Sequence, residues 1–105
     1  MQPNYKPPFK AFVKKQNKPL QLAIEDAVED VCRAPNIGEQ KTGDLRGIWV
    51  YKFTHKTRLY LIAYRPPMDE ALKAEGVDIE LLVIDFFQAG THENFYAALK
   101  KYLKS

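Results

Sequence analysis

The chain has 105 residues, 46% of them hydrophobic, and a net charge of +3, which suits one domain with its own core and excludes a disordered chain. Its single cysteine, Cys32, excludes an internal disulfide and a CxxC metal site and fits a reducing compartment. No apolar run reaches the roughly 18–20 residues of a membrane span, and the N-terminal stretch lacks the hydrophobic centre of a secretion signal. We therefore expect a cytoplasmic protein that makes no membrane contact and uses neither a cofactor nor a metal.

Charge is distributed unevenly along the chain. Residues 1–18 carry five lysines and no acid, and residues 41–65 carry six Lys or Arg against one Asp. Residues 25–30 and 69–80 are by contrast acidic. Such segregation gives one face a positive potential and favours a polyanionic partner, although the N-terminal lysines could equally be scattered, solvated charges.

Two helices are predicted first. Phe9, Phe12 and Val13 lie at helical spacing after a Pro-Pro pair, with lysines on the other side. Pro19 suits the first position of a second helix, which should end before Pro35. The second helix has an apolar stripe of Leu20, Ile24, Ala27, Val28 and Val31. Together the two helices predict a helical hairpin that lies on an apolar surface.

Three strands follow, over residues 48–53, 58–65 and 78–87, because each run is rich in β-branched and aromatic residues. The short loop THKT joins the first two into an antiparallel hairpin. The longer link before the third strand contains MDEALKAEG, which could form a helical turn closed by Gly76.

A last helix is predicted from Thr91, a suitable N-cap, with a core stripe of Phe95, Leu99, Tyr102 and Leu103. The fold class expected is α+β: a small antiparallel sheet with the N-terminal helical hairpin and the C-terminal helix packed on one face. Residues 1–105 should form a single domain.

Strand polarity raises a functional possibility. In IWVYKF, Ile48, Val50 and Lys52 share one face and the aromatic residues share the other. A basic sheet face left free by the helices could bind a phosphate backbone while interleaved aromatics stack on bases. The alternative, favoured for each residue taken singly, is that these are ordinary core aromatics: Trp49, Tyr51, Tyr60 and Tyr64.

The two histidines have different contexts. His55 lies in a predicted turn, where an exposed, solvated side chain is the default. His92 lies four residues before Tyr96, so a helix would place both on one face. With basic residues nearby, such a pair could perform acid/base chemistry on a phosphodiester, whereas the alternative is that His92 only caps the helix.

Taken together, IGEQKTGDLRGIWVYKF, RLYLIAYR and AGTHENFYAALKKYL resemble the RelE/ParE superfamily of bacterial toxins from type II toxin–antitoxin modules. The similarity covers about residues 9 to 103. It implies a helical hairpin on a small antiparallel sheet and a cognate antitoxin as a partner. In the ribonuclease branch it also implies a toxin that cuts mRNA on the ribosome, through attack of a 2′-hydroxyl on the adjacent phosphate, and arrests growth.

The same resemblance implies roles for individual residues. His92 or Lys52 would be the general base, Arg58 or Arg65 would neutralise the phosphate, and Tyr96 would orient or stack the nucleotide. The catalytic set is thus Lys52, Arg65, His92 and Tyr96. The residues expected to hold RNA are Lys41, Arg46, His55, Lys56 and Arg58.

Three features depart from the ribonuclease pattern. A full amphipathic helix follows Tyr96, the segment 66–77 is longer than usual, and the N-terminal strand of the family would have to form from QPNYK, a poor strand sequence. The ParE branch shares the fold and poisons DNA gyrase, so gyrase is the alternative target. A third possibility is a non-catalytic module that only binds an antitoxin.

Overall fold

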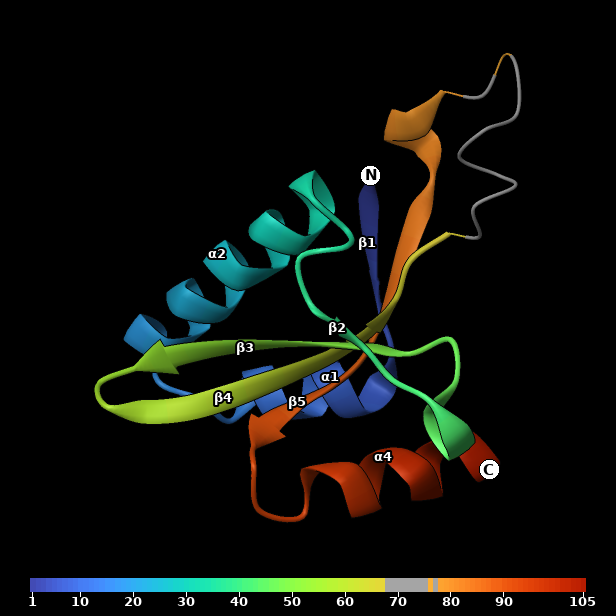
Figure 1. Cartoon of the computed structure of the whole chain (residues 1–105). Helices are drawn as coiled ribbons and strands as arrows, with labels where there is room; N and C mark the ends of the chain where they lie inside the picture. Colours follow the sequence, from blue (N-terminus) through green and yellow to red (C-terminus); the bar gives the residue numbers. More distant parts are fainter. Residues whose placement is uncertain (68–75, 77) are drawn as a thin grey trace.

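The computed structural model describes residues 1–67, 76 and 78–105, so the helical turn predicted over 68–76 lies outside the described residues except for Gly76. The described elements follow one another in a simple order (Figure 1). They are β1 (Gln2–Tyr5), α1 (Pro7–Lys14), α2 (Lys18–Arg33), β2 (Glu39–Gln40), the 3₁₀ turn η1 (Gly43–Leu45), β3 (Trp49–His55), β4 (Arg58–Arg65), the 3₁₀ turn η2 (Ile79–Leu81), β5 (Val83–Thr91) and α4 (Phe95–Lys104). In this described part, no helix combines the length and apolar character that crossing a bilayer requires.

The strands form one open sheet in the order β1-β5-β4-β3-β2. The expected α+β class is confirmed, and so is the sequence of neighbours β3, β4 and β5, which pair antiparallel. The sheet is nevertheless mixed, because β1 runs parallel to β5. The stretch QPNYK, expected to be a poor strand, therefore does contribute one. Its strand character comes from hydrogen bonds to an existing edge: the Gln2 N–H donates to the Leu82 carbonyl at 2.8 Å, and the Lys6 N–H donates to the Phe86 carbonyl at 2.9 Å.

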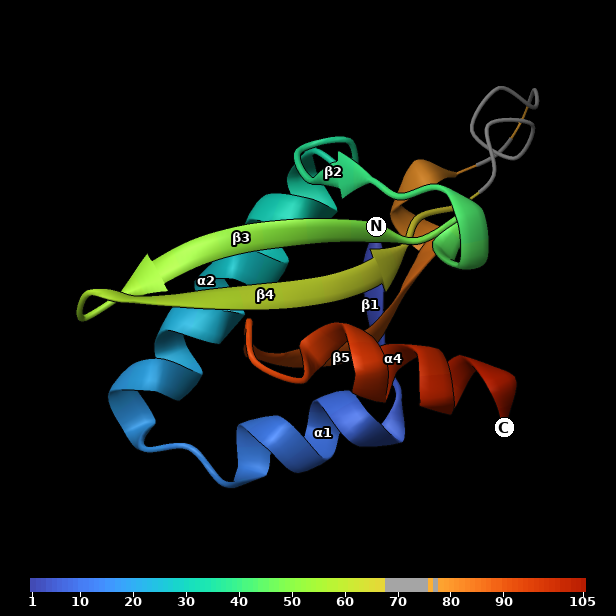
Figure 2. The same cartoon turned by 60° about the horizontal axis from the view of Figure 1, so that its bottom comes forward.

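The helices do not share one face of the sheet, so that expectation was wrong. Helices α1 and α2 pack on one face and α4 packs on the other (Figure 2). The reason is that β3, β4 and β5 are apolar on both faces. Tyr60, Ile62 and Tyr64 join the core under α1 and α2, whereas Leu61 and Ala63 join a second core under α4.

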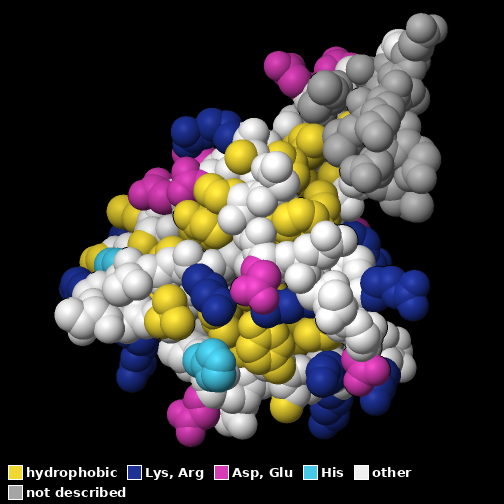
Figure 3. All heavy atoms as spheres, viewed as in Figure 1, with side chains coloured by type: hydrophobic (Ala, Val, Ile, Leu, Met, Phe, Trp, Pro, Cys, Tyr) yellow, Lys and Arg dark blue, Asp and Glu magenta, His cyan; other side chains and the backbone are white. Residues whose placement is uncertain are grey.

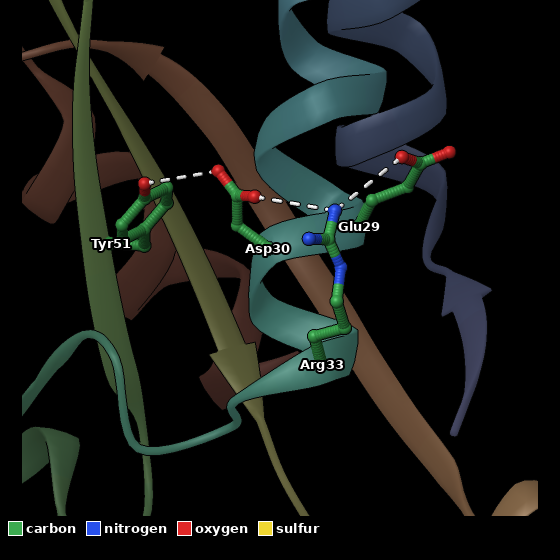
Figure 4. A network of polar contacts seen from close by, with 4 residues as sticks. All are labelled: Glu29, Asp30, Arg33 and Tyr51. Carbon is green, nitrogen blue, oxygen red and sulfur yellow. Dashed lines mark hydrogen bonds and ion pairs between the residues drawn. The ribbon is translucent and has the colours of Figure 1, made fainter.

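Helix α2 follows its predicted pattern. The Asn17 side chain accepts a hydrogen bond from the Leu20 N–H at 3.1 Å, which caps the helix, and Pro19 occupies its first turn. All five residues of the predicted stripe are buried. The exposed side of the helix reaches β3 through a polar contact, because the Tyr51 hydroxyl lies 3.4 Å from an Asp30 carboxylate oxygen (Figure 4). The Arg33 guanidinium lies 3.7 Å from the same carboxylate, an exposed pair that contributes little to stability.

The third strand was predicted too early along the chain. It begins at Val83 instead of residue 78, since Ile79–Leu81 form a 3₁₀ turn. Thr91 ends β5 and is not the N-cap of the last helix; that position is taken by Asn94 in the left-handed region, at φ 62°. A bulge opposite Ala63 and Tyr64 inserts Phe87 into β5. Phe86 enters the core under α1 and α2 and Phe87 enters the core under α4, as strand alternation requires. Because of the extra residue, Ala89, three positions after Phe86, returns to the core under α1 and α2.

The β3–β4 hairpin turns tightly at Lys56 and Thr57. Both residues have positive φ angles, 48° and 69°. Two-residue hairpin turns of this kind usually carry Asn-Gly, because other residues are strained in the left-handed region, β-branched ones most of all. The turn therefore holds a basic and a β-branched residue where local energetics favour neither.

Candidate functional site

The α4 side of the sheet is only partly covered. Ile48, just before β3, and Val50 of β3 are buried under the helix, whereas Lys52, on the same face, is exposed. Lys52 pairs with Leu61, which in turn pairs with Gly90, so it lies near the end of β5. A side-chain carbon on Gly90 would already be in van der Waals contact with Phe95, the first residue of α4. The N-terminal end of α4 therefore lies close to Lys52, and the sheet beyond this end is not covered by the helix.

Three side chains from separate parts of the sequence meet at this end. Lys41 follows β2, His92 lies in the turn after β5, and Tyr96 lies in the first turn of α4. The His92 and Tyr96 rings meet edge to face with centroids 6.0 Å apart, and the Lys41 ammonium lies 5.4 Å from the centre of the Tyr96 ring. Figure 3 shows basic, acidic and histidine side chains gathered around an apolar surface between β3 and α4. We call Lys41, His92 and Tyr96 the polar cluster.

Glu39 controls the charge of the cluster. Its carboxylate lies 3.0 Å from the Lys41 ammonium. The hydrogen bond to Lys41 lowers the pKa of Glu39, and the charge of Lys52 also lowers it, which places Lys52 within electrostatic range. In return Glu39 raises the pKa of Lys41, and Tyr96 contributes in the same direction. Lys41 is therefore a permanent cation at neutral pH, suited to binding an anion and unsuited to accepting a proton.

A buried tyrosine positions the segment that carries Glu39 and Lys41. The Tyr64 hydroxyl donates to the Pro35 carbonyl at 2.7 Å and accepts from the Gly38 N–H at 3.1 Å. Strand β2 then pairs with β3 at Glu39 opposite Val50. The Lys41 N–H donates to the Ile48 carbonyl at 2.9 Å, which holds Lys41 beside the sheet.

The residues predicted from the sequence do not all lie together. Lys52 lies near the polar cluster. Arg65 lies on the same face but at the far end of β4, with its guanidinium 5.1 Å from the centre of the Phe87 ring. Lys52 pairs with Leu61 of β4, and Arg65 lies four residues after Leu61, which is about 13 Å along the strand. Arg46 is the C-cap residue of the η1 turn, between β2 and β3.

The hairpin residues lie elsewhere again. His55 and Arg58 pair across the β3–β4 turn, with Lys56 between them. They line a concave surface together with Asn17 and Leu20, which belong to the start of α2, and with Tyr60. This surface therefore belongs to the α1/α2 side of the sheet and is separate from the polar cluster.

The aromatic strand residues are structural. Trp49, Tyr51 and Phe53 pack against the core under α1 and α2, and Tyr60 and Tyr64 are buried in it. They face away from Lys52, so the strand aromatics are not interleaved with Lys52 on its own face of the sheet. The alternative reading of these residues as core aromatics is the one that fits.

Two features of the site were not anticipated. Glu39 was not considered, although its spacing of two from Lys41 in an extended segment puts both side chains on one face. His92 and Tyr96 were expected on one helix face, but His92 precedes the helix and reaches Tyr96 from a turn. Among the described residues, no group of three or more His, Cys, Asp or Glu side chains could hold a metal ion.

The structure resembles a chain of the intact E. coli RelBE toxin–antitoxin complex, with a TM-score of 0.60, 14% identity, and coverage of 88% of this chain and 96% of that chain. At that identity the likeness establishes a RelE-like fold. No curated protein matches the sequence.

The sequence itself defines the family. A family model described as the ParE-like toxin of type II bacterial toxin–antitoxin systems matches residues 4–100. The chain therefore belongs to this family of ParE-like toxins, and the resemblance drawn from its motifs is confirmed.

Proposed function

We propose that this toxin is a ribosome-dependent mRNA endonuclease whose chemistry takes place at the polar cluster and Lys52. The observation that supports the proposal is the meeting of Lys41, His92 and Tyr96 from three separate elements, at an exposed end of the sheet. A histidine, a tyrosine and a fixed cation are side chains from which metal-independent cleavage of RNA can be assembled.

The reaction follows from the residue types. His92 accepts the proton of a ribose 2′-hydroxyl, because histidine is the side chain best suited to accept a proton near neutral pH. The 2′-oxygen then forms a bond to the adjacent phosphorus while the bond from phosphorus to the 5′-oxygen breaks. The leaving oxygen takes the proton of the Tyr96 hydroxyl, whose ionised form the Lys41 ammonium stabilises. Proton return from His92 to Tyr96 through water restores the site.

The two lysines stabilise charge rather than transfer protons. Lys41 is held as a cation by Glu39, and Lys52 adds a second positive charge on the same face. Both are placed to neutralise the additional negative charge that a pentacovalent phosphorus carries in the transition state. The first turn of α4 adds the partial positive charge of a helix N-terminus.

The ribosome is expected to supply what the cluster lacks. His92 is exposed and Tyr96 is half-buried on an open surface, so the site by itself does little to orient a nucleotide. Holding the 2′-hydroxyl in line with the scissile bond is worth about 7–11 kcal/mol in favourable cases. We therefore expect free RNA to be cut poorly and translated mRNA to be cut well.

Induced expression of the chain tests this function. Growth should stop, primer extension on a translated reporter mRNA should show new 5′ ends, and a reporter of the SOS response in the same cells should stay silent. Intact transcripts together with strong SOS induction would exclude the ribonuclease and identify a gyrase poison.

The gyrase alternative has its own support. The matching family is named for ParE, α4 is a complete helix of 10 residues, and Arg65 lies over the Phe87 ring, four residues along β4 from the partner of Lys52. A gyrase poison needs no acid and base at the cluster, so cell killing would then survive loss of His92. Absence of any effect on growth would favour a module that only binds its antitoxin.

We also propose that an antitoxin binds the groove between α1 and α2. The groove has a volume of about 380 Å³ and an apolar floor that includes Phe9, Val13 and Val28. Lys10 and Lys14 line it from α1, and Glu25 lines it from α2. An amphipathic antitoxin segment with acidic residues toward α1 would complement both its apolar floor and its charges.

Replacing Val13 by glutamate should weaken this association. A carboxylate placed on the groove floor would be desolvated without a partner, which should weaken antitoxin binding at least tenfold. Co-purification with the antitoxin encoded beside the toxin measures the effect. Leu22→Glu is the matched control, because Leu22 is 47% exposed on α2 and does not line the groove. Equal retention of antitoxin by both variants would rule out the groove.

A further inference from the structure

The tip of the β3–β4 hairpin carries two cationic side chains and a histidine. His55, Lys56 and Arg58 lie within four positions of one another and line the same concave surface, whose volume is about 230 Å³. Asn17 and Leu20 complete its wall from the start of α2. In Figures 1 and 2 the hairpin tip lies beside this end of α2 and away from the C-terminal end of α4.

These cations have no acidic counterpart. No lining residue is acidic, and the sequence contains no Asp or Glu between residues 45 and 68. In the described part of the chain, the ion pairs involve Arg33, Lys41 and Lys100, and none involves Lys56 or Arg58. Mutual repulsion at the tip is therefore left uncompensated within the described structure, and an anion bound there would relieve it.

The backbone adds an independent observation. The two turn residues, Lys56 and Thr57, both occupy the left-handed region that Asn and Gly adopt at lower cost. A turn selected only to connect two strands would favour those residues. The lysine at this position places an ammonium at the tip of a rigid hairpin, between the histidine and the arginine.

We propose that His55, Lys56 and Arg58 form a binding site for the phosphodiester backbone of nucleic acid, separate from the polar cluster. The site reads no sequence, because its lining offers cations and few groups that could recognise base edges. His55 and Arg58 lie on the face of α1 and α2, whereas Lys52 lies on the face of α4. A nucleic-acid segment bound at the hairpin therefore does not reach the polar cluster on the other face. The hairpin instead anchors a different segment of the same structured nucleic acid from the one that would enter the polar cluster.

Binding to an uncleavable probe tests the site without depending on the proposed chemistry. The probe is a fluorescent 2′-O-methyl RNA stem–loop, whose blocked 2′-oxygens cannot attack, and a DNA duplex of matched length forms the second arm. The full chain and its variants are titrated by anisotropy over a range of salt concentrations. Lys56→Gln combined with Arg58→Gln should weaken binding about fivefold to eightfold per lost cation at 0.1 M salt, with a shallower salt dependence.

Two controls make the result specific. The double variant Lys101→Gln with Lys104→Gln removes the same amount of charge from two exposed positions in the last turn of α4, far from the hairpin tip. It should change the affinity less than about twofold. Thr57→Gly lowers the strain of the positive φ angle in the turn, keeps Lys56, Arg58 and His55, and should preserve binding. If the chain binds the RNA stem–loop tightly and the DNA duplex weakly, the ligand of the site is RNA. If it binds both probes equally, the site recognises the phosphodiester backbone of either nucleic acid.

The proposal is overturned if the hairpin variant and the α4 control lose the same affinity, because net charge alone would then explain binding. It is equally overturned if neither probe binds the unaltered chain. Either result leaves the cleavage assay on translated mRNA unaffected, so failure of this site and failure of the proposed endonuclease are distinguishable.

Discussion

His92→Ala is expected to lower the rate of ribosome-dependent mRNA cleavage by about 10²–10⁴-fold, the usual contribution of a general base. His92 is exposed in a turn, and its ring contacts Tyr96 only edge to face, so its removal should leave the fold intact. The measurement is cleavage of a reporter mRNA on purified ribosomes, with thermal unfolding of the same variant as the test of folding.

Two matched variants separate catalysis from structure. Glu93→Ala alters the exposed neighbour of His92 and should retain cleavage. Tyr96→Phe keeps the ring beside Lys41 but removes the hydroxyl, and it should lose activity without losing stability. Added imidazole should partly restore His92→Ala, because it replaces the missing base. Full cleavage by His92→Ala, or growth arrest unchanged in cells that express it, would contradict the role assigned to this residue.

Gly38→Ala should displace the segment that carries Glu39 and Lys41. A side-chain carbon at this position would lie 2.7 Å from the Tyr64 hydroxyl and 2.8 Å from the Val50 carbonyl oxygen, distances that neither neighbour can accept without moving. Tyr64 is fully buried and the Val50 carbonyl belongs to β3, so β2 is the part that must shift. We expect a loss of about 1–3 kcal/mol in the free energy of unfolding and a loss of activity.

Urea unfolding of three variants checks the cause. Tyr64→Phe leaves the Gly38 N–H and the Pro35 carbonyl without their partner and should cost about 1–3 kcal/mol. Combined with Gly38→Ala it should cost less than the sum, because the missing hydroxyl removes one of the two clashes. Gly90→Ala is the control, since its new carbon would lie 3.7 Å from Phe95, an ordinary contact. Additive effects at Gly38 and Tyr64 would contradict the coupling.

Much of the fold was predictable because local patterns agree with the tertiary structure. The apolar stripe of α2 predicts one helix, between Asn17 and Pro35, with its apolar face buried, and this is what the structure has. Strands β3 and β4 are defined by their residues and by the short turn between them, and the opposite directions of Val50 and Tyr51 follow from strand geometry alone. The motifs that connect these elements were sufficient to recognise the toxin family.

Other features depended on contacts between distant segments. The QPNY of β1 has no apolar alternation and becomes a strand only because the edge of β5 offers unpaired backbone groups. The stripe of α4 shows that one side of the helix is buried, but the choice of sheet face depends on apolar residues on both faces of β4. The sequence by itself determined the family, the helical hairpin and the central strands, and it showed where basic residues concentrate along the chain. Only the tertiary structure decided that Lys41, His92 and Tyr96 meet while the hairpin cations lie elsewhere, because residues so far apart in the chain are brought together by sheet register and by the Tyr64 hydrogen bonds.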